Sequence, residues 1–138
     1  CCFDRTPLDE ILGTLEAARM SGSGIRVFPM IDRMPKRGRT FLVELAADKR
    51  ILEHPNYLRV GGRPFIVTFS MHGPAEWRER MKLVREAGAD FLVVSDSLEY
   101  EATPWPYPRE VLDELLESVD GLYAFNDLHP SSAAMVRG

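Results

Sequence analysis

The feature that most constrains the fold is a regular alternation between segments with helical spacing of apolar residues and short apolar runs. The short runs are Ile25–Ile31, Phe65–Phe69, Phe91–Val94 and Leu122–Phe125. Each run has apolar residues on both alternations, which is typical of strands covered on both faces of a sheet. Because a helix-like segment lies between each pair of runs, the pattern predicts βαβ units and a parallel sheet.

The intervening segments carry ordinary helix signals. Proline or a capping hydroxyl residue stands at each start, and glycine or proline follows the end of the first three. The predicted helices run from Pro7 to before Gly22, from Thr40 through Leu52, from Pro74 to before Gly88, and from Pro108 through Leu116. Two longer loops, Arg33–Arg39 and Leu98–Tyr107, separate a strand from the next helix, and residues 129–138 show no pattern.

Two architectures fit about four such units in 138 residues. One is a small open doubly wound sheet, and the other is about half of a (β/α)8 barrel, which typically needs about 250 residues. Uneven strand spacing and a long second crossover favour the barrel, which carries insertions easily. The chain also lacks the glycine signature and the phosphate-loop lysine of many open sheets. We therefore predict an α/β fold, a partial (β/α)8 (TIM) barrel, with residues 1–138 as one domain.

Composition removes several function classes. A net charge of −4 and a pI near 5.4 argue against a nucleic-acid partner, which would need a basic face. No apolar run reaches the roughly 18 residues that suit a membrane span. The three histidines are scattered, and Cys1-Cys2 has no metal-ligand spacing, so we predict no metal site. The chain begins at Cys1 rather than Met, and we expect it to be a fragment.

Candidate site residues follow the strands, since in both architectures the working residues lie just past the carboxyl ends. Each has an alternative as a turn residue, a helix cap or a small residue that closes a strand. The strand-end residues are Asp32; Thr68, Ser70 and His72; Ser95, Asp96 and Ser97; and Asn126, Asp127 and His129.

The loop before the fourth helix adds two aromatic candidates. Trp105 and Tyr107 stand between prolines, which restrict the backbone. This restriction lowers the entropic cost of holding an aromatic side chain in place for a ligand. Flat aromatic faces suit the apolar faces of sugar rings, so both are candidate stacking platforms. The alternative is that Trp105 packs down onto the barrel, as large aromatics usually do.

Three segments in order resemble glycoside hydrolase families 71 and 99. Tyr57–Phe69 (Y-L-R-V-G-G-R-P-F-I-V-T-F) resembles their Y-x-x-x-G-K/R-P-strand segment. Val27–Asp32 is similar to an earlier family strand that ends in Phe-Asp. Val119–Pro130 resembles both the D-G-x-S-W-D-x-W-P segment of the family 71 α-1,3-glucanases and a strand of the family 99 endo-α-mannosidases. The resemblance implies a (β/α)8 barrel that cleaves α-linked polysaccharide without a cofactor.

The chain departs from that family pattern in two ways. Phe125 and His129 stand where the last segment would have tryptophans. The family's catalytic carboxylates belong to a later strand-end motif that has no counterpart here and would fall after Gly138. The resemblance therefore extends only to pocket positions: Asp32, Thr68–Ser70 and Asn126–Asp127. Because glycoside hydrolysis needs two opposed carboxylates, we expect this chain alone to be inert.

Two rival interpretations remain. The chain could be a complete small doubly wound binding or regulatory domain, with Asp32 and Asp96 in an acidic pocket as in response-regulator receivers. A receiver would also need a lysine near the end of a late strand, and none follows the fourth strand. A different barrel hydrolase or isomerase could use the same strand-end carboxylates. On the first interpretation the partner is a carbohydrate, and an extracellular polysaccharide would imply secretion or a periplasmic location. Oligomeric state stays open.

Overall fold

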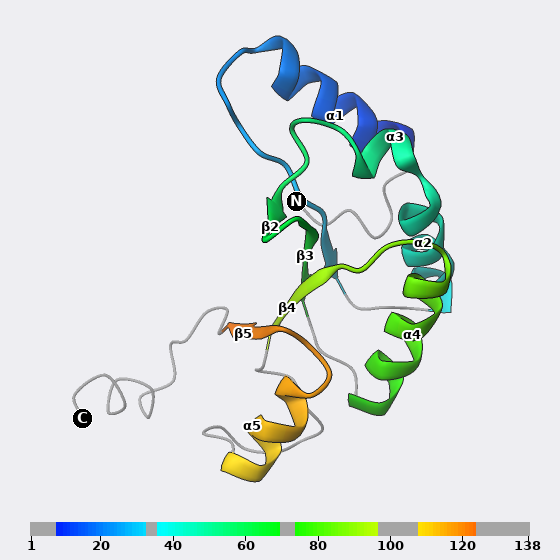
Figure 1. Ribbon diagram of the computed structural model, residues 1–138, viewed down its shortest axis with the longest axis vertical. Helices are drawn as coiled ribbons and strands as arrows, with labels where there is room; N and C mark the ends of the chain where they lie inside the picture. The colour runs from blue at the N-terminus through cyan, green and yellow to red at the C-terminus, as the bar shows by residue number, and fades with distance from the viewer. Residues whose placement is uncertain (1–7, 33–35, 70–73, 97–107, 124–138) are drawn as a thin grey trace, which may run out of the picture.

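The computed structural model describes residues 8–32, 36–69, 74–96 and 108–123. Helices and strands alternate along these residues, with one additional strand and one additional short helix beyond the predicted pattern (Figure 1). In chain order the elements are α1 (Leu8–Met20), β1 (Met30–Asp32), α2 (Lys36–Ala47), α3 (Lys49–Leu52), β2 (Arg59–Val60), β3 (Arg63–Phe69), α4 (Pro74–Glu86), β4 (Leu92–Asp96), α5 (Arg109–Leu116) and β5 (Gly121–Tyr123).

The sheet has five strands, four of them parallel. The parallel strands lie in the order β1-β3-β4-β5, which is also their order along the chain. The short strand β2 pairs antiparallel with the start of β3 through a two-residue turn at Gly61 and Gly62. Both glycines have positive φ, 58° and 80°, as a tight hairpin turn that matches strand twist requires.

This topology confirms an α/β fold with a parallel sheet. It also lacks, among the described strands, the reversal of strand order that defines a doubly wound sheet. Sequential neighbours joined by helices are what successive right-handed βαβ crossovers produce when they all turn the same way.

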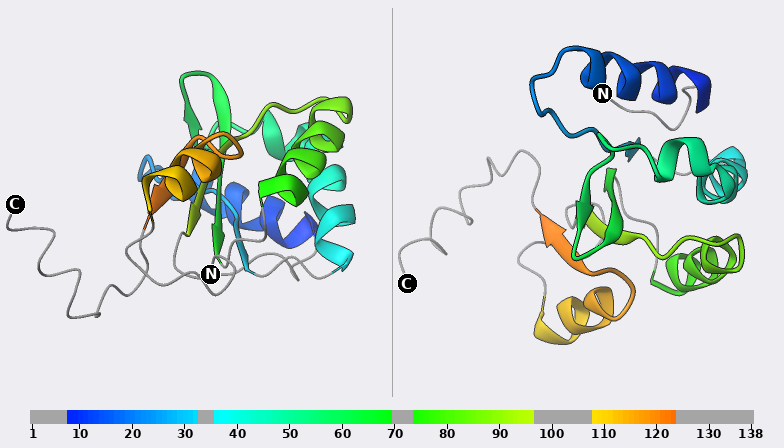
Figure 2. Two further views of the ribbon diagram at one scale, coloured as in Figure 1. Left: turned by 90° about the horizontal axis from the view of Figure 1, so that it is seen from below. Right: turned by 45° about the horizontal axis from the view of Figure 1, so that its top comes forward.

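All five helices lie on one side of the sheet, in an arc around it (Figure 2, right). Their apolar faces meet one face of the strands in a single core cluster. Trp77 and Val84 of α4, Leu45 of α2 and Leu15 of α1 are almost fully buried there. The sheet residues in this cluster alternate along the strands, as a pleated strand requires: Ile31, Ile66 and Val93.

The opposite face, called the open face below, bears apolar side chains that do not belong to that cluster. No helix of the described residues covers it (Figure 2). The ring of Phe28 contacts that of Phe65 edge to face, with 5.0 Å between centroids. Most of these side chains are half-buried rather than buried. The open face consists of Phe28, Met30, Phe65, Val67, Leu92, Val94 and Tyr123.

Several predicted boundaries were wrong. The strand expected over Ile25–Ile31 is ordered as a strand only at Met30–Asp32, with one isolated bridge between Val27 and Tyr57. The loop expected over Arg33–Arg39 includes the start of α2. The single helix expected through Leu52 is interrupted at Asp48, which caps α3. Strand β2 was not predicted. Within the described ranges, no helix is long and apolar enough to cross a membrane.

Candidate functional site

The carboxyl edge of the sheet brings two predicted aspartates into one row. Asp32 ends β1 and is in register with Phe69 of β3. Asp96 ends β4 and is in register with Tyr123 of β5. Because Thr68 pairs with Ser95 one row earlier, the two aspartates occupy the same row on either side of β3. Strand spacing then puts their Cα atoms on the order of 10 Å apart.

One row below this edge, two hydroxyl residues form a buried pair. The side-chain oxygens of Thr68 and Ser95 are 2.7 Å apart, and the two residues are 1% and 0% exposed. Thr68 follows Ile66 by two residues and Ser95 follows Val93 by two, so both share the helix-covered face with these core residues. The Thr68 hydroxyl is therefore committed to Ser95 in this structure, and its role in a sugar pocket stays a prediction.

Tyr123 is a residue of this edge that the sequence interpretation missed. Its hydroxyl donates to the backbone carbonyl of Thr68 over 3.0 Å, which carries the ring across the end of β4. The residue is half-buried and lies on the open face, in register with Asp96. A usable signal existed, because Tyr123 alternates with apolar Leu122 within the predicted strand and must point to the other face.

The remaining candidates lie outside the described residues, and their positions are not assigned. Asp32 and Asp96 are located by the register of their strands. The candidates outside the described residues are Ser70, His72, Ser97, Trp105, Tyr107, Asn126, Asp127 and His129. Within residues 8–32, 36–69, 74–96 and 108–123, no three His, Cys, Asp or Glu side chains gather as a metal-ligand group.

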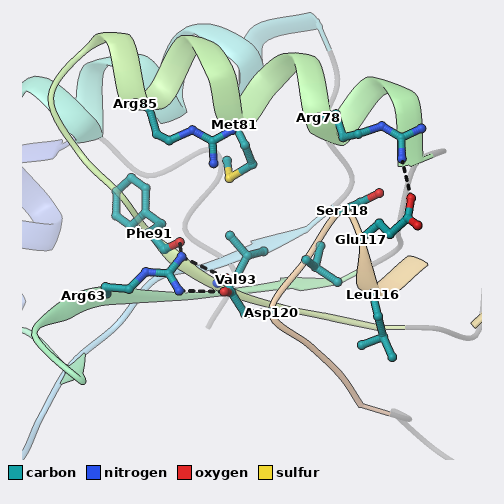
Figure 3. Close-up of a pocket in the computed structure, with 11 residues that line it drawn as sticks. Arg63, Arg78, Met81, Arg85, Phe91, Val93, Leu116, Glu117, Ser118 and Asp120 are labelled. Carbon is teal, nitrogen blue, oxygen red and sulfur yellow. Dashed lines mark hydrogen bonds and ion pairs between the residues drawn. The ribbon is translucent and has the colours of Figure 1, made fainter. Parts of the chain in front are cut away.

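At the opposite, amino end of the sheet an arginine joins three consecutive parallel strands (Figure 3). Arg63, at the start of β3, donates to both carboxylate oxygens of Asp120 at 2.6 and 3.2 Å, and to the carbonyl of Phe91 at 2.6 Å. Asp120 in turn accepts from the backbone N–H of Val93 at 2.9 Å. These contacts fix the amino ends of β3, β4 and β5 and so support the register of the far edge.

The electrostatics of this arginine–aspartate pair are those of a partly buried ion pair. Burial alone would raise the pKa of Asp120. The hydrogen bonds from Arg63 and from the Val93 N–H, with the positive charges of Arg63 and Arg85, outweigh burial and hold the pKa below its ordinary value of 3.8. Asp120 is therefore ionised at neutral pH and stays so under mildly acidic conditions.

Comparison with known proteins adds no assignment: no family model, no curated protein and no solved structure matches this chain. The class of protein is therefore defined by the fold alone. It is a parallel α/β protein with sequential strands, one face of the sheet covered by helices, and two aspartates in one row at the carboxyl edge.

Proposed function

We propose that this chain forms part of a (β/α)8 barrel of a glycoside hydrolase that acts on α-linked polysaccharide, such as α-1,3-glucan or α-mannan. The chain would supply part of the barrel wall and of the sugar pocket, while the catalytic carboxylate pair would come from elsewhere in the barrel. The observation that best supports this proposal is the sequential order of four parallel strands, with the described helices on one side of the sheet. In a closed barrel the helices form an outer ring and the opposite sheet face turns inward.

The open face supports the barrel part of this proposal. Its side chains are mainly large and apolar, like those that fill a barrel interior in layers. Met30, Val67 and Val94 share a row and point to the same face of the sheet, so all three would face this interior. An open doubly wound sheet would instead place helices over both faces.

The carboxyl edge supports the carbohydrate part. Asp32 and Asp96 lie where barrel enzymes keep their substrate-binding groups. Carboxylates accept hydrogen bonds from sugar hydroxyls, and the half-buried ring of Tyr123 adds an aromatic surface beside Asp96. The resemblance of Tyr57–Phe69 to families 71 and 99 points to the same substrate class.

The rival interpretation, a complete doubly wound regulatory domain, would use the same two aspartates as an acidic pocket. The strand order counts against it, because such a domain needs a reversal that creates a crevice between adjacent strands.

The proposal is tested by titrating the chain with oligosaccharides while following backbone amide chemical shifts. We expect saturable shifts at the carboxyl edge, around Asp32, Phe69 and Asp96, with α-1,3-linked glucose or α-linked mannose oligomers. A β-linked glucose oligomer should produce none. Asp96→Asn should weaken binding several-fold, whereas Asp113→Asn, an equal charge change on the exposed side of α5, should leave it unchanged.

Two results would contradict the proposal. The first is the absence of saturable shifts at this edge with every α-linked oligomer. The second is equal binding of α- and β-linked oligomers. Release of reducing sugar by the chain alone would refute the specific inference that the catalytic pair lies elsewhere.

A further inference from the structure

A pocket lies at the amino end of the sheet, away from Asp32 and Asp96. It has a volume of about 180 Å³ and opens between α4, α5 and the first residues of β4 (Figure 3). Its lining combines buried apolar side chains, among them Met81 and Val93, with several charged side chains. Three of these are arginines from two different elements, Arg63, Arg78 and Arg85.

The three arginines differ in how firmly they are neutralised. Arg63 is held by Asp120 through short hydrogen bonds and is not free to bind a ligand. Among the described residues, Arg78 makes a single long ion pair, with Glu117, 3.7 Å between Nη1 and Oε2, and both side chains are about half-exposed or more. Within the described residues, the Arg85 side chain makes no hydrogen bond or ion pair, although its charge acts on Asp120.

The formal charges around the pocket balance, and the pairing leaves Arg85 as the guanidinium that meets no carboxylate directly among the described residues. Arg63 is shared by Asp120 and by Asp90, whose Oδ2 is 3.2 Å from Arg63 Nε, and Arg78 faces Glu117. Arg78 and Arg85 are seven residues apart on α4, about two helical turns, so both extend from the same helix face. Figure 3 shows both on the pocket side of α4, with Met81 between them.

We propose that this pocket binds a small tetrahedral oxyanion, a phosphate group, with Arg85 as its main ligand and Arg78 as the second. A planar guanidinium donates two parallel hydrogen bonds to adjacent oxygens of such a group, which fits phosphate better than a point charge would. Arg78 would exchange its long contact with Glu117 for the anion. This site is independent of the carbohydrate proposal, since it lies at the other end of the strands.

The test is a titration of the full chain with inorganic phosphate at neutral pH and low ionic strength, followed by backbone amide shifts. We expect saturable shifts confined to α4 and to residues 116–120. Arg85→Gln should weaken phosphate binding at least ten-fold. Arg109→Gln removes the same charge from an exposed position on α5, where it pairs with Asp113 at 3.6 Å, and should change binding less than two-fold.

A second pair of variants tests the sign of the effect. Glu117→Gln releases Arg78 and removes a repelling charge, so it should tighten binding two- to five-fold. Glu110→Gln, at the exposed start of α5, should not. If Arg85→Gln fails to fold, Arg85→Lys keeps the positive charge but lacks the paired N–H donors of a guanidinium. It should therefore still weaken phosphate binding several-fold.

Three outcomes would overturn the proposal. One is no saturable binding below about 10 mM phosphate, which corresponds to only about 3 kcal/mol of affinity. Another is an equal loss of phosphate affinity in Arg85→Gln and Arg109→Gln, which would show that binding depends on the net charge of the protein and not on this pocket. The last is acetate binding as tightly as phosphate, which would assign the pocket to carboxylates instead.

Discussion

At the scale of single residues, the contact between Arg63 and Asp120 makes a testable contribution to stability. Asp120→Asn removes the charge from hydrogen bonds that join β3, β4 and β5. We expect a loss of about 1–2 kcal/mol at pH 7, at the lower end for charged hydrogen bonds because both side chains are about one-third exposed. Urea unfolding of the two proteins measures the difference.

The same pair predicts a pH dependence. Because folding lowers the pKa of Asp120, the unfolded chain binds this proton more tightly. The stabilisation is therefore complete above the ordinary pKa of 3.8 and is lost as pH falls below it, through the lowered folded-state pKa. The gap between wild type and Asp120→Asn should shrink toward about pH 2. A gap that stays constant with pH would contradict the ion pair, and Asp113→Asn provides an exposed control.

The buried hydroxyl pair gives a second residue-scale prediction. Thr68→Val removes a partner from Ser95 at nearly constant shape and should cost about 1–2 kcal/mol. Ser95→Ala should cost a similar amount. In the double variant neither hydroxyl of the pair remains, so its cost should be about 1 kcal/mol less than the sum of the two single costs, measured by chemical denaturation. Strictly additive costs would show that the 2.7 Å contact contributes nothing.

The positions of the strand-end residues could be predicted from the sequence, but the face of the sheet to which each side chain points could not. Asp32 and Asp96 were placed at the carboxyl edge because apolar runs stop there, and each is the last residue of its strand. The face that Thr68 occupies depends on which strand residues meet the helices. A strand with apolar residues on both alternations does not reveal which of its two faces this is. Tyr123 was missed because its role depends on a carbonyl 55 residues away.

At the scale of secondary-structure elements, the break between α2 and α3 has a local cause. Asp48 adopts an extended backbone, φ −86° and ψ 92°, and its side chain accepts from the backbone N–H of Arg50. The carboxylate also binds the Arg50 guanidinium at 2.7 Å, and this hydrogen bond is the main reason that the pKa of Asp48 is lowered. The helical spacing of apolar residues continues through this point, so periodicity alone predicted one helix.

This cap predicts a specific mutational result. Asp48→Ala should destabilise the protein by about 1 kcal/mol, the usual cost of losing an N-cap. Asp48→Asn retains a capping oxygen and should cost less than about half of that, because it loses mainly an exposed ion pair. Thermal unfolding monitored by circular dichroism distinguishes the two. Equal destabilisation by both variants would mean that charge, and not capping, holds α3.

At the scale of the whole molecule, local sequence patterns predicted that helices and strands alternate. They did not predict that the described helices cover only one face of the sheet, because this depends on the topology of the chain. Runs with apolar residues on both alternations indicated strands covered on both faces. Among the described residues, however, only one face meets helices, and the open face has the apolar character of a covered one. The sequence thus encodes a second covered surface, which is why barrel interior is the interpretation we propose.

This asymmetry can be measured with a pair of neighbouring residues. Val93 faces the core cluster and is 1% exposed, whereas Leu92 lies on the open face and is half-buried. Val93→Thr places a hydroxyl in the core and should cost about 1–3 kcal/mol, and Leu92→Thr should cost less than about 1 kcal/mol in this chain. In the proposed closed barrel, where other residues would cover the open face, the cost of Leu92→Thr should rise to match that of Val93→Thr. Urea unfolding of both forms provides the comparison. If Leu92→Thr were already as costly as Val93→Thr in the present chain, the open face would have to be covered here, and the argument from one-sided helices would fail.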